Sequence, residues 1–195
     1  MPSRIEVLSI TTLLEGWSKV IRVIYRQLRR DGSWQQQDRD LLDRGDGVTT
    51  LLHNPERGTV LLLRQPRVMV AMRGADDAGE MLEACSGQVP REETPLACAL
   101  REVEEETGHR LPELRHVGSV YACPGASLEI VHLYLGEYHD ATVAGDAGGL
   151  HHEGEDIELI ELPLDEAIGL IDSGEIRDAR TILVLEYLYR RTQGR

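Results

Sequence analysis

Four carboxylates crowd one short stretch of this chain, "REVEEETG", at residues 101–108. They belong to Glu102, Glu104, Glu105 and Glu106, and like charges this close on a helix repel each other. One interpretation is a solvated helix face in an acidic protein. The other is a site of hard oxygen ligands, which Mg²⁺ and Mn²⁺ prefer. The types and spacing of the surrounding residues decide between these two interpretations.

The residues that flank the acids predict a helix over residues 95–107. Thr94 is a suitable N-cap, Pro95 suits the first helical position, and Gly108 is a natural C-terminal stop. An apolar stripe is expected to meet the core, and it consists of Leu96, Leu100 and Val103. Three of the acids are spaced by three and four residues and should project together, about 130° around the helix from that stripe. These are Glu102, Glu105 and Glu106.

The acids belong to a longer pattern of fixed spacing, and the pattern favours the cation site. Its members are Gly87, Glu93, Arg101, Glu102, Glu105, Glu106 and Gly108. This pattern resembles the Nudix box of the nucleoside-diphosphate-linked pyrophosphatases, except that His109 stands where an apolar residue is usual. The resemblance implies an α/β/α sandwich with a mixed β-sheet, and a divalent cation, Mg²⁺ or alternatively Mn²⁺, that assists hydrolysis of a pyrophosphate.

The same resemblance assigns roles to individual residues. Glu102 and Glu106 would bind the metal directly, and Glu105 would be a further ligand or a catalytic partner. The backbone carbonyl of Ser86 would complete the metal site. Arg101 and Glu93 are expected to pair with each other and to hold loop against helix, which is a structural role.

The rest of the chain indicates an α/β protein with two parts. Residues 20–28 and 34–42 read as strands around an Asp31-Gly32 turn, so residues 1–45 are expected to form an N-terminal antiparallel β meander. Residues 46–195 would form the Nudix domain. Its expected strands are residues 48–52, 59–63 and 82–85, followed by three more after Gly108, and its last two helices begin near residues 164 and 178.

Similarities outside the box point to one branch of the family. Pro124, sixteen residues beyond Gly108, resembles the branch that cleaves ADP-ribose and nucleotide sugars. Stretches such as "EACSG" and "SGEIRDARTILVLEYL" resemble the bacterial GDP-mannose pyrophosphatase group. The expected reaction is hydrolysis of GDP-mannose to GMP and mannose 1-phosphate. The alternatives are an ADP-ribose pyrophosphatase, which gives AMP and ribose 5-phosphate, and a non-catalytic regulator that senses nucleotide sugars.

In that branch the general base comes from a loop after the last long strand, which here is "GGLHHEGEDIEL". By resemblance Glu153 would be the base and Glu155 an additional metal ligand, although acids also simply keep a polar loop solvated. Substrate contacts are expected from four residues, of which the two arginines in "RQPR" suit both phosphate and base. The four are Arg64, Arg67, Glu129 and Arg177.

Charge and composition limit the partners. The formal net charge of −13 argues against nucleic acid and anionic membranes as partners. The three cysteines show no paired spacing, and neither a signal peptide nor an apolar run of membrane-spanning length is present, so a reducing cytoplasm is expected. By resemblance, the N-terminal meander would join two copies into a homodimer.

Overall fold

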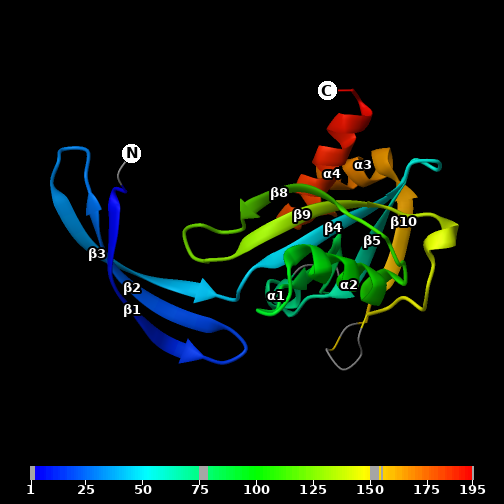
Figure 1. Cartoon of the computed structure of the whole chain (residues 1–195). Helices are drawn as coiled ribbons and strands as arrows, with labels where there is room; N and C mark the ends of the chain where they lie inside the picture. The colour runs from blue at the N-terminus through cyan, green and yellow to red at the C-terminus, as the bar shows by residue number, and fades with distance from the viewer. Residues whose placement is uncertain (1–2, 75–78, 150–153, 155, 195) are drawn as a thin grey trace. The chain divides into compact units, whose positions relative to one another are not determined.

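The computed structural model describes residues 3–74, 79–149, 154 and 156–194. The chain divides into two compact units (Figure 1). One comprises Met1–Asp46 together with Tyr121–Ile130, and the other comprises Gly47–Val120 together with Val131–Arg195. The predicted boundary near residue 45 did not anticipate that a second segment, 121–130, belongs with the N-terminal strands.

The N-terminal unit is an antiparallel sheet in the order β1-β2-β3. Its strands are β1 Ile5–Glu15, β2 Lys19–Leu28 and β3 Trp34–Asp43. The predicted hairpin is confirmed, because Leu28 pairs with Trp34 and Gly32 takes the left-handed conformation with φ of +86°. Strand β1 was not predicted. Segment 121–130 joins β3 through two backbone hydrogen bonds to Leu42. The Leu42 N–H donates to the Ala126 carbonyl, and the Leu42 carbonyl accepts from the Leu128 N–H.

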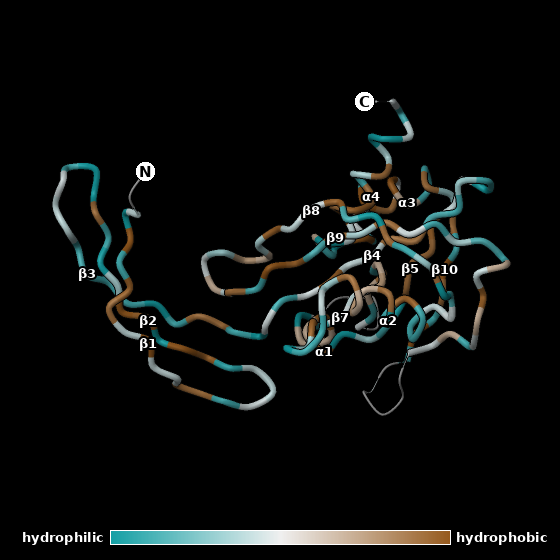
Figure 2. Tube along the Cα trace, viewed as in Figure 1, coloured by the Kyte–Doolittle hydropathy of each residue, from teal (hydrophilic) through white to brown (hydrophobic). Residues whose placement is uncertain are grey.

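Strand β1 is apolar along much of its length and yet exposed throughout. All of its residues are exposed, including Ile5, Val7, Leu8, Ile10, Leu13 and Leu14. Figure 2 shows these brown segments along the first strand. A strand rich in apolar residues normally covers a core with at least one face. Among the residues that the structure describes, none buries a face of this strand.

The second unit is built on a seven-stranded sheet with the central order β10-β5-β4-β9-β8. Strand β4 runs parallel to β9 and antiparallel to β5, so the sheet is mixed, as predicted. The short strands β6 and β7 pair with β5 and β4. The bounds are β4 Gly47–Asn54, β5 Thr59–Pro66, β6 Glu80–Glu83, β7 Cys85–Gln88, β8 Arg115–Tyr121, β9 Ile130–Glu137 and β10 Glu158–Pro163.

Helices cover both faces of this sheet, which confirms the predicted α/β/α sandwich (Figure 1). Two of them, α3 and α4, pack on one face through residues such as Leu164 and Leu185. Helix α2 packs on the other face through Val103. The helical bounds are α1 Val68–Met72, α2 Pro95–Thr107, α3 Leu164–Ser173, α4 Ala179–Thr192 and a 3-10 turn, η1, at Asp140–Thr142. No described helix is long and apolar enough to cross a membrane.

Candidate active site

Helix α2 begins and ends where the sequence predicted. The Thr94 hydroxyl accepts a hydrogen bond from the Ala97 backbone N–H at 3.3 Å, and Gly108 ends the helix in the left-handed conformation with φ of +70°. The predicted apolar stripe is partly wrong, because Leu96 is 43% exposed. The face that the helix buries is therefore rotated about its axis relative to the predicted stripe. The buried residues are Cys98, Ala99, Val103, Glu106 and Thr107. This rotation brings Glu106 into the interior.

The carboxylates of Glu102 and Glu106 both face strand β7. Glu106 is 1% exposed, and its carboxylate accepts a hydrogen bond from the Ser86 backbone N–H at 3.0 Å. A Cβ atom on Gly87 would overlap the Glu102 carboxylate. The box glycine lies within strand β7 and has no positive φ, so it does not form a left-handed turn. Its missing side chain instead makes room for Glu102.

Arg101 forms ion pairs with three of the surrounding acids. Its guanidinium lies 2.7 Å from a Glu105 oxygen, 2.9 Å from a Glu102 oxygen and 3.2 Å from a Glu93 oxygen. The predicted pair with Glu93 is confirmed, and the other two contacts were not predicted. Partial burial lowers the pKa of Arg101, but the hydrogen bonds and charges of these acids outweigh it and raise the pKa above that of a free arginine.

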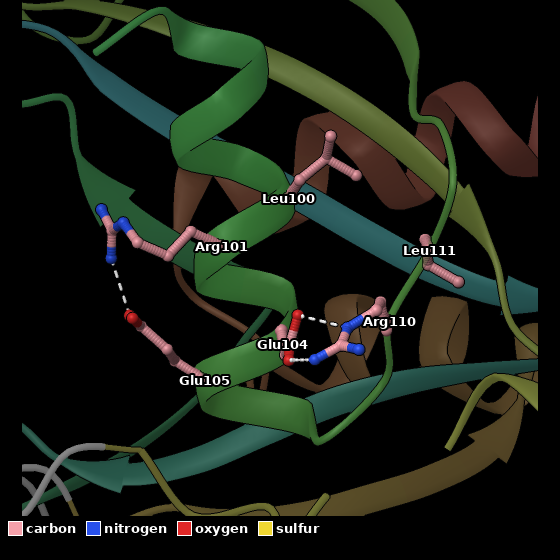
Figure 3. A pocket seen from close by; sticks show the side chains of 6 residues that line it. All are labelled: Leu100, Arg101, Glu104, Glu105, Arg110 and Leu111. Carbon is pink, nitrogen blue, oxygen red and sulfur yellow. Dashed lines mark hydrogen bonds and ion pairs between the residues drawn. The ribbon is translucent and has the colours of Figure 1, made fainter. Parts of the chain in front are cut away.

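The acids of α2 therefore fall into two groups. Figure 3 shows Glu105 bonded to Arg101 and Glu104 bonded to Arg110. These pairs line a hollow of about 380 Å³ with Leu100 and Leu111 at its sides. By helical geometry this face points away from Glu106. Arg110 thus balances Glu104, and Arg101 balances Glu105 while it also contacts Glu102. The carboxylates of Glu102 and Glu106 lie on the side of β7, so Glu105 does not project together with them as predicted.

The chemistry of the inner group fits a hard divalent cation. Mg²⁺ binds oxygen ligands such as carboxylates and backbone carbonyls, and both kinds of oxygen are present where these side chains face strand β7. Burial raises the pKa of Cys98 to about 12, and burial followed by the charge of Glu106 raises the pKa of Cys85 well above its usual range. Both neighbouring thiols are therefore protonated at neutral pH in the metal-free protein, and hard cations prefer oxygen to sulfur. Within the described ranges no three Asp, Glu, His or Cys side chains are already arranged to hold a metal ion.

Two of the predicted site residues, Glu153 and Glu155, lie outside the described residues. Glu129 belongs to the N-terminal unit and is half-buried, while Arg177 is exposed between α3 and α4. Arg64 lies on β5 and pairs with Glu158 of β10 at 3.0 Å. Arg64, Arg67 and Arg177 thus belong to the second unit and Glu129 to the N-terminal unit, and their joint role in substrate binding stays a prediction.

Arg67 has the most structured environment of these four. Its Nε lies 2.6 Å from the carboxylate of Glu83, which is 2% exposed at the end of β6. The other Glu83 oxygen accepts a hydrogen bond from Arg180 of α4 at 3.4 Å. A buried carboxylate requires such partners because its desolvation is costly. The chain leads from Glu83 directly into β7, so this cluster adjoins the box.

Arg180 was not predicted as a functional residue from the sequence. Its neighbour Asp178 caps helix α4 by accepting from the Thr181 N–H at 2.9 Å, and the Thr181 hydroxyl accepts from the Ala84 N–H at 2.8 Å. The only local signal was the capping residue Asp178 before an apolar run. The partner Glu83 is 97 residues away in the chain, and such a contact has no signature in local spacing.

Comparisons with known proteins agree with this geometry. The NUDIX domain family matches residues 43–185. GDP-mannose pyrophosphatase of Citrobacter koseri is 38% identical over 189 residues, which cover 97% of each chain. The GDP-mannose pyrophosphatase of Escherichia coli is 37% identical over 188 residues, or 96% of each chain. The crystal structure of an ADP compounds hydrolase shares the fold, with a TM-score of 0.72 over 98% of this chain and 96% of that one at 17% identity. The chain therefore belongs to the NUDIX domain family and is a Nudix hydrolase.

Proposed function

We propose that the chain hydrolyses the pyrophosphate bond of a nucleoside diphosphate sugar, with GDP-mannose as the leading substrate and GMP and mannose 1-phosphate as products. The observation that carries this proposal is the pair of carboxylates from Glu102 and Glu106 held against β7 at Gly87. The substrate is suggested by the relatives named GDP-mannose pyrophosphatase, which match nearly the full chain.

Glu102, Glu106 and the Ser86 carbonyl are the proposed holders of a divalent cation, with Glu105 and Glu155 as additional ligands. A bound Mg²⁺ or Mn²⁺ would neutralise phosphate charge and lower the pKa of water. Glu105 would first have to leave Arg101, which it contacts at 2.7 Å. Glu153 is the proposed base that takes the proton from the attacking water.

Substrate binding is assigned to Arg64, Arg67, Glu129 and Arg177. Arg67 is the best supported of the four, because Glu83 orients its guanidinium and 38% of its side chain is still exposed. A guanidinium held in this way can offer its remaining N–H groups to a phosphate with little loss of entropy. The exposed apolar strand β1 supports a homodimer.

The first test is product identification with purified protein, Mg²⁺ and either GDP-mannose or ADP-ribose. Dominant release of GMP and mannose 1-phosphate would support the proposal. Preferential release of AMP and ribose 5-phosphate would support the proposed reaction but would identify ADP-ribose as the substrate. Binding of a nucleotide sugar without any product would instead favour a sensor.

A matched pair of variants on α2 tests the carboxylate site. Glu106→Gln keeps the side-chain shape and an acceptor for the Ser86 N–H but removes the charge, so kcat should fall by about a hundredfold or more. Glu104→Gln changes an outer acid that pairs with Arg110 and should leave kcat nearly unchanged. Circular dichroism verifies folding of both, and substantial turnover by Glu106→Gln would refute the site.

A further inference from the structure

The segment from His139 to Gly149 is attached to the C-terminal end of α2. Four of its backbone N–H groups donate to carbonyls at that end: Ala144 and Gly145 to Gly108 at 2.8 and 3.2 Å, Gly148 to Glu106 at 3.2 Å, and Gly149 to Glu105 at 3.3 Å. The last carbonyls of a helix have no partner within the helix. Here this segment, which we call the docking segment, supplies partners for two of them.

Gly108 allows this attachment. A Cβ atom at Gly108 would lie 2.5 Å from the Gly145 carbonyl oxygen, closer than side-chain carbons come to backbone atoms. The docking segment therefore rests directly on the helix stop, and two of its bonds reach the backbone of Glu105 and Glu106. Its position is coupled to the residues proposed to hold the cation.

His109, the departure from the family pattern, bonds to the first turn of the docking segment. Its Nδ1 lies 2.8 Å from the hydroxyl oxygen of Thr142. That hydroxyl donates its single proton to the His139 carbonyl at 2.7 Å and accepts from the His139 N–H at 3.1 Å. The proton between His109 and Thr142 must therefore come from His109, which places a proton on Nδ1 of the imidazole.

The surroundings of His109 agree with a neutral, fixed ring. The residue is 8% exposed and packs against the Tyr138 ring with centroids 5.1 Å apart. Burial lowers the pKa of the imidazole below its usual range, by more than the nearby carboxylates of Glu161 and Asp140 raise it. A leucine at this position could fill the same space but could not donate to Thr142.

We propose that His109 is a positioning residue: its Nδ1–H bond to Thr142 fixes the docking segment on α2, and the bonds of this segment to the Glu105 and Glu106 carbonyls hold the helix end that carries the proposed cation ligands. This inference rests on the proposed function, in which Glu106 holds the cation. A displacement of about 1 Å at a catalytic group can lower the rate by up to about a hundredfold. Loss of the bond should therefore lower kcat and change KM much less.

The test compares His109→Leu, which keeps an apolar side chain, with His109→Asn, whose amide N–H can replace the Nδ1–H. The Leu variant should lose about tenfold in kcat with little change in KM, and the Asn variant should recover most of it. Thr142→Val removes this bond together with the two bonds of the hydroxyl to His139, so it should be at least as slow as the Leu variant. The double variant should be no slower than Thr142→Val alone, because that variant has already lost the bond to His109.

Hydrogen exchange of the peptide that contains Ala144 to Gly149 provides a readout independent of turnover. Exchange should be faster in His109→Leu than in wild type and normal in His109→Asn. Unchanged exchange in the Leu variant would refute the anchoring, and wild-type kcat in that variant would refute the positioning role. Absence of turnover by the wild-type protein would overturn the proposed function and this role in catalysis, while the exchange data would still decide the anchoring.

Discussion

Gly87 shows how one missing side chain controls the position of a carboxylate. It lies in β7 opposite Val48 of β4, and the Glu102 side chain occupies the space that a Cβ atom would take. The Glu102 side chain is only 13% exposed and also contacts Arg101. Sheet pairing on one side and the helix on the other leave Glu102 little room to move away. Any side chain at position 87 must therefore displace the carboxylate.

We predict that Gly87→Ala lowers the affinity for Mg²⁺ by about tenfold to a hundredfold, as displaced ligand shells commonly do. The control is Gly118→Ala in β8, where an added Cβ meets no atom within 4 Å. Titration with Mn²⁺ followed by electron paramagnetic resonance measures both variants. Equal affinities in the two variants would contradict the proposed role of Glu102 as a ligand.

At the residue scale, the sequence identified groups whose partners lie close in the chain. Arg101 and Glu93 are eight positions apart and pair as predicted. Glu83 and Arg180 were missed because their bond joins β6 to α4 and depends on tertiary packing. Arg64, which resemblance predicts to be a substrate residue, pairs with Glu158 of the neighbouring strand β10, and its role in binding stays a prediction.

At the scale of elements, the two ends of α2 serve different purposes. The N-terminal end is closed locally by Thr94, and such a cap can be read from the sequence. The C-terminal end is closed by Gly108 and by the docking segment, which is more than thirty residues further along the chain. The first could be predicted from capping residues, and the second could not, because no local pattern links the two segments.

A comparison of two helix stops isolates this second contribution. Gly108 and Gly174 both end helices in the left-handed conformation, with φ of +70° and +80°. A Cβ atom at Gly174 meets nothing within 4 Å, whereas one at Gly108 meets Gly145. We predict that Gly174→Ala lowers the free energy of unfolding by about 1 kcal/mol. Gly108→Ala should lower it further and should also lower kcat.

Urea unfolding and steady-state kinetics of both alanine variants check this prediction. The difference between the two free energies measures the docking contact, since the backbone strain is similar in both. If Gly108→Ala and Gly174→Ala were equally stable and equally active, the docking segment would contribute nothing to the helix end.

At the scale of the molecule, the α/β class followed from several strand candidates accompanied by a few helices, and the sandwich followed from the resemblance; the mixed sheet is as expected. The division of the chain into two units, one of them built from two separate segments, could not be predicted from the sequence. Segment 121–130 joins the N-terminal strands through Leu42, a pairing between residues about eighty positions apart. Strand β1 was missed because its apolar residues do not keep a strict alternation, and register shifts interrupt its pairing with β2.

The exposed strand β1 gives the proposed homodimer a specific test. At least six of its apolar side chains are 46–62% exposed in the single chain, and β1 is the outer strand of its sheet. Exposed apolar edge strands are rare in monomers, because they promote association. Covering this strand with the same surface of a second copy would remove its apolar area from water. We therefore expect the wild-type protein to sediment as a dimer.

The combined substitution Ile10→Glu and Leu14→Glu should shift the protein to monomer, since burying two carboxylates at an interface is unfavourable. The matched control is Ser9→Glu with Thr11→Glu, which adds the same charge at exposed polar positions of the same strand. Sedimentation equilibrium over a range of concentrations distinguishes the two. A monomeric wild-type protein, or a dimer unaffected by Ile10→Glu and Leu14→Glu, would show that β1 is not the interface. A loss of activity that accompanies the monomer, with the secondary structure intact, would further indicate that the second copy completes the substrate site.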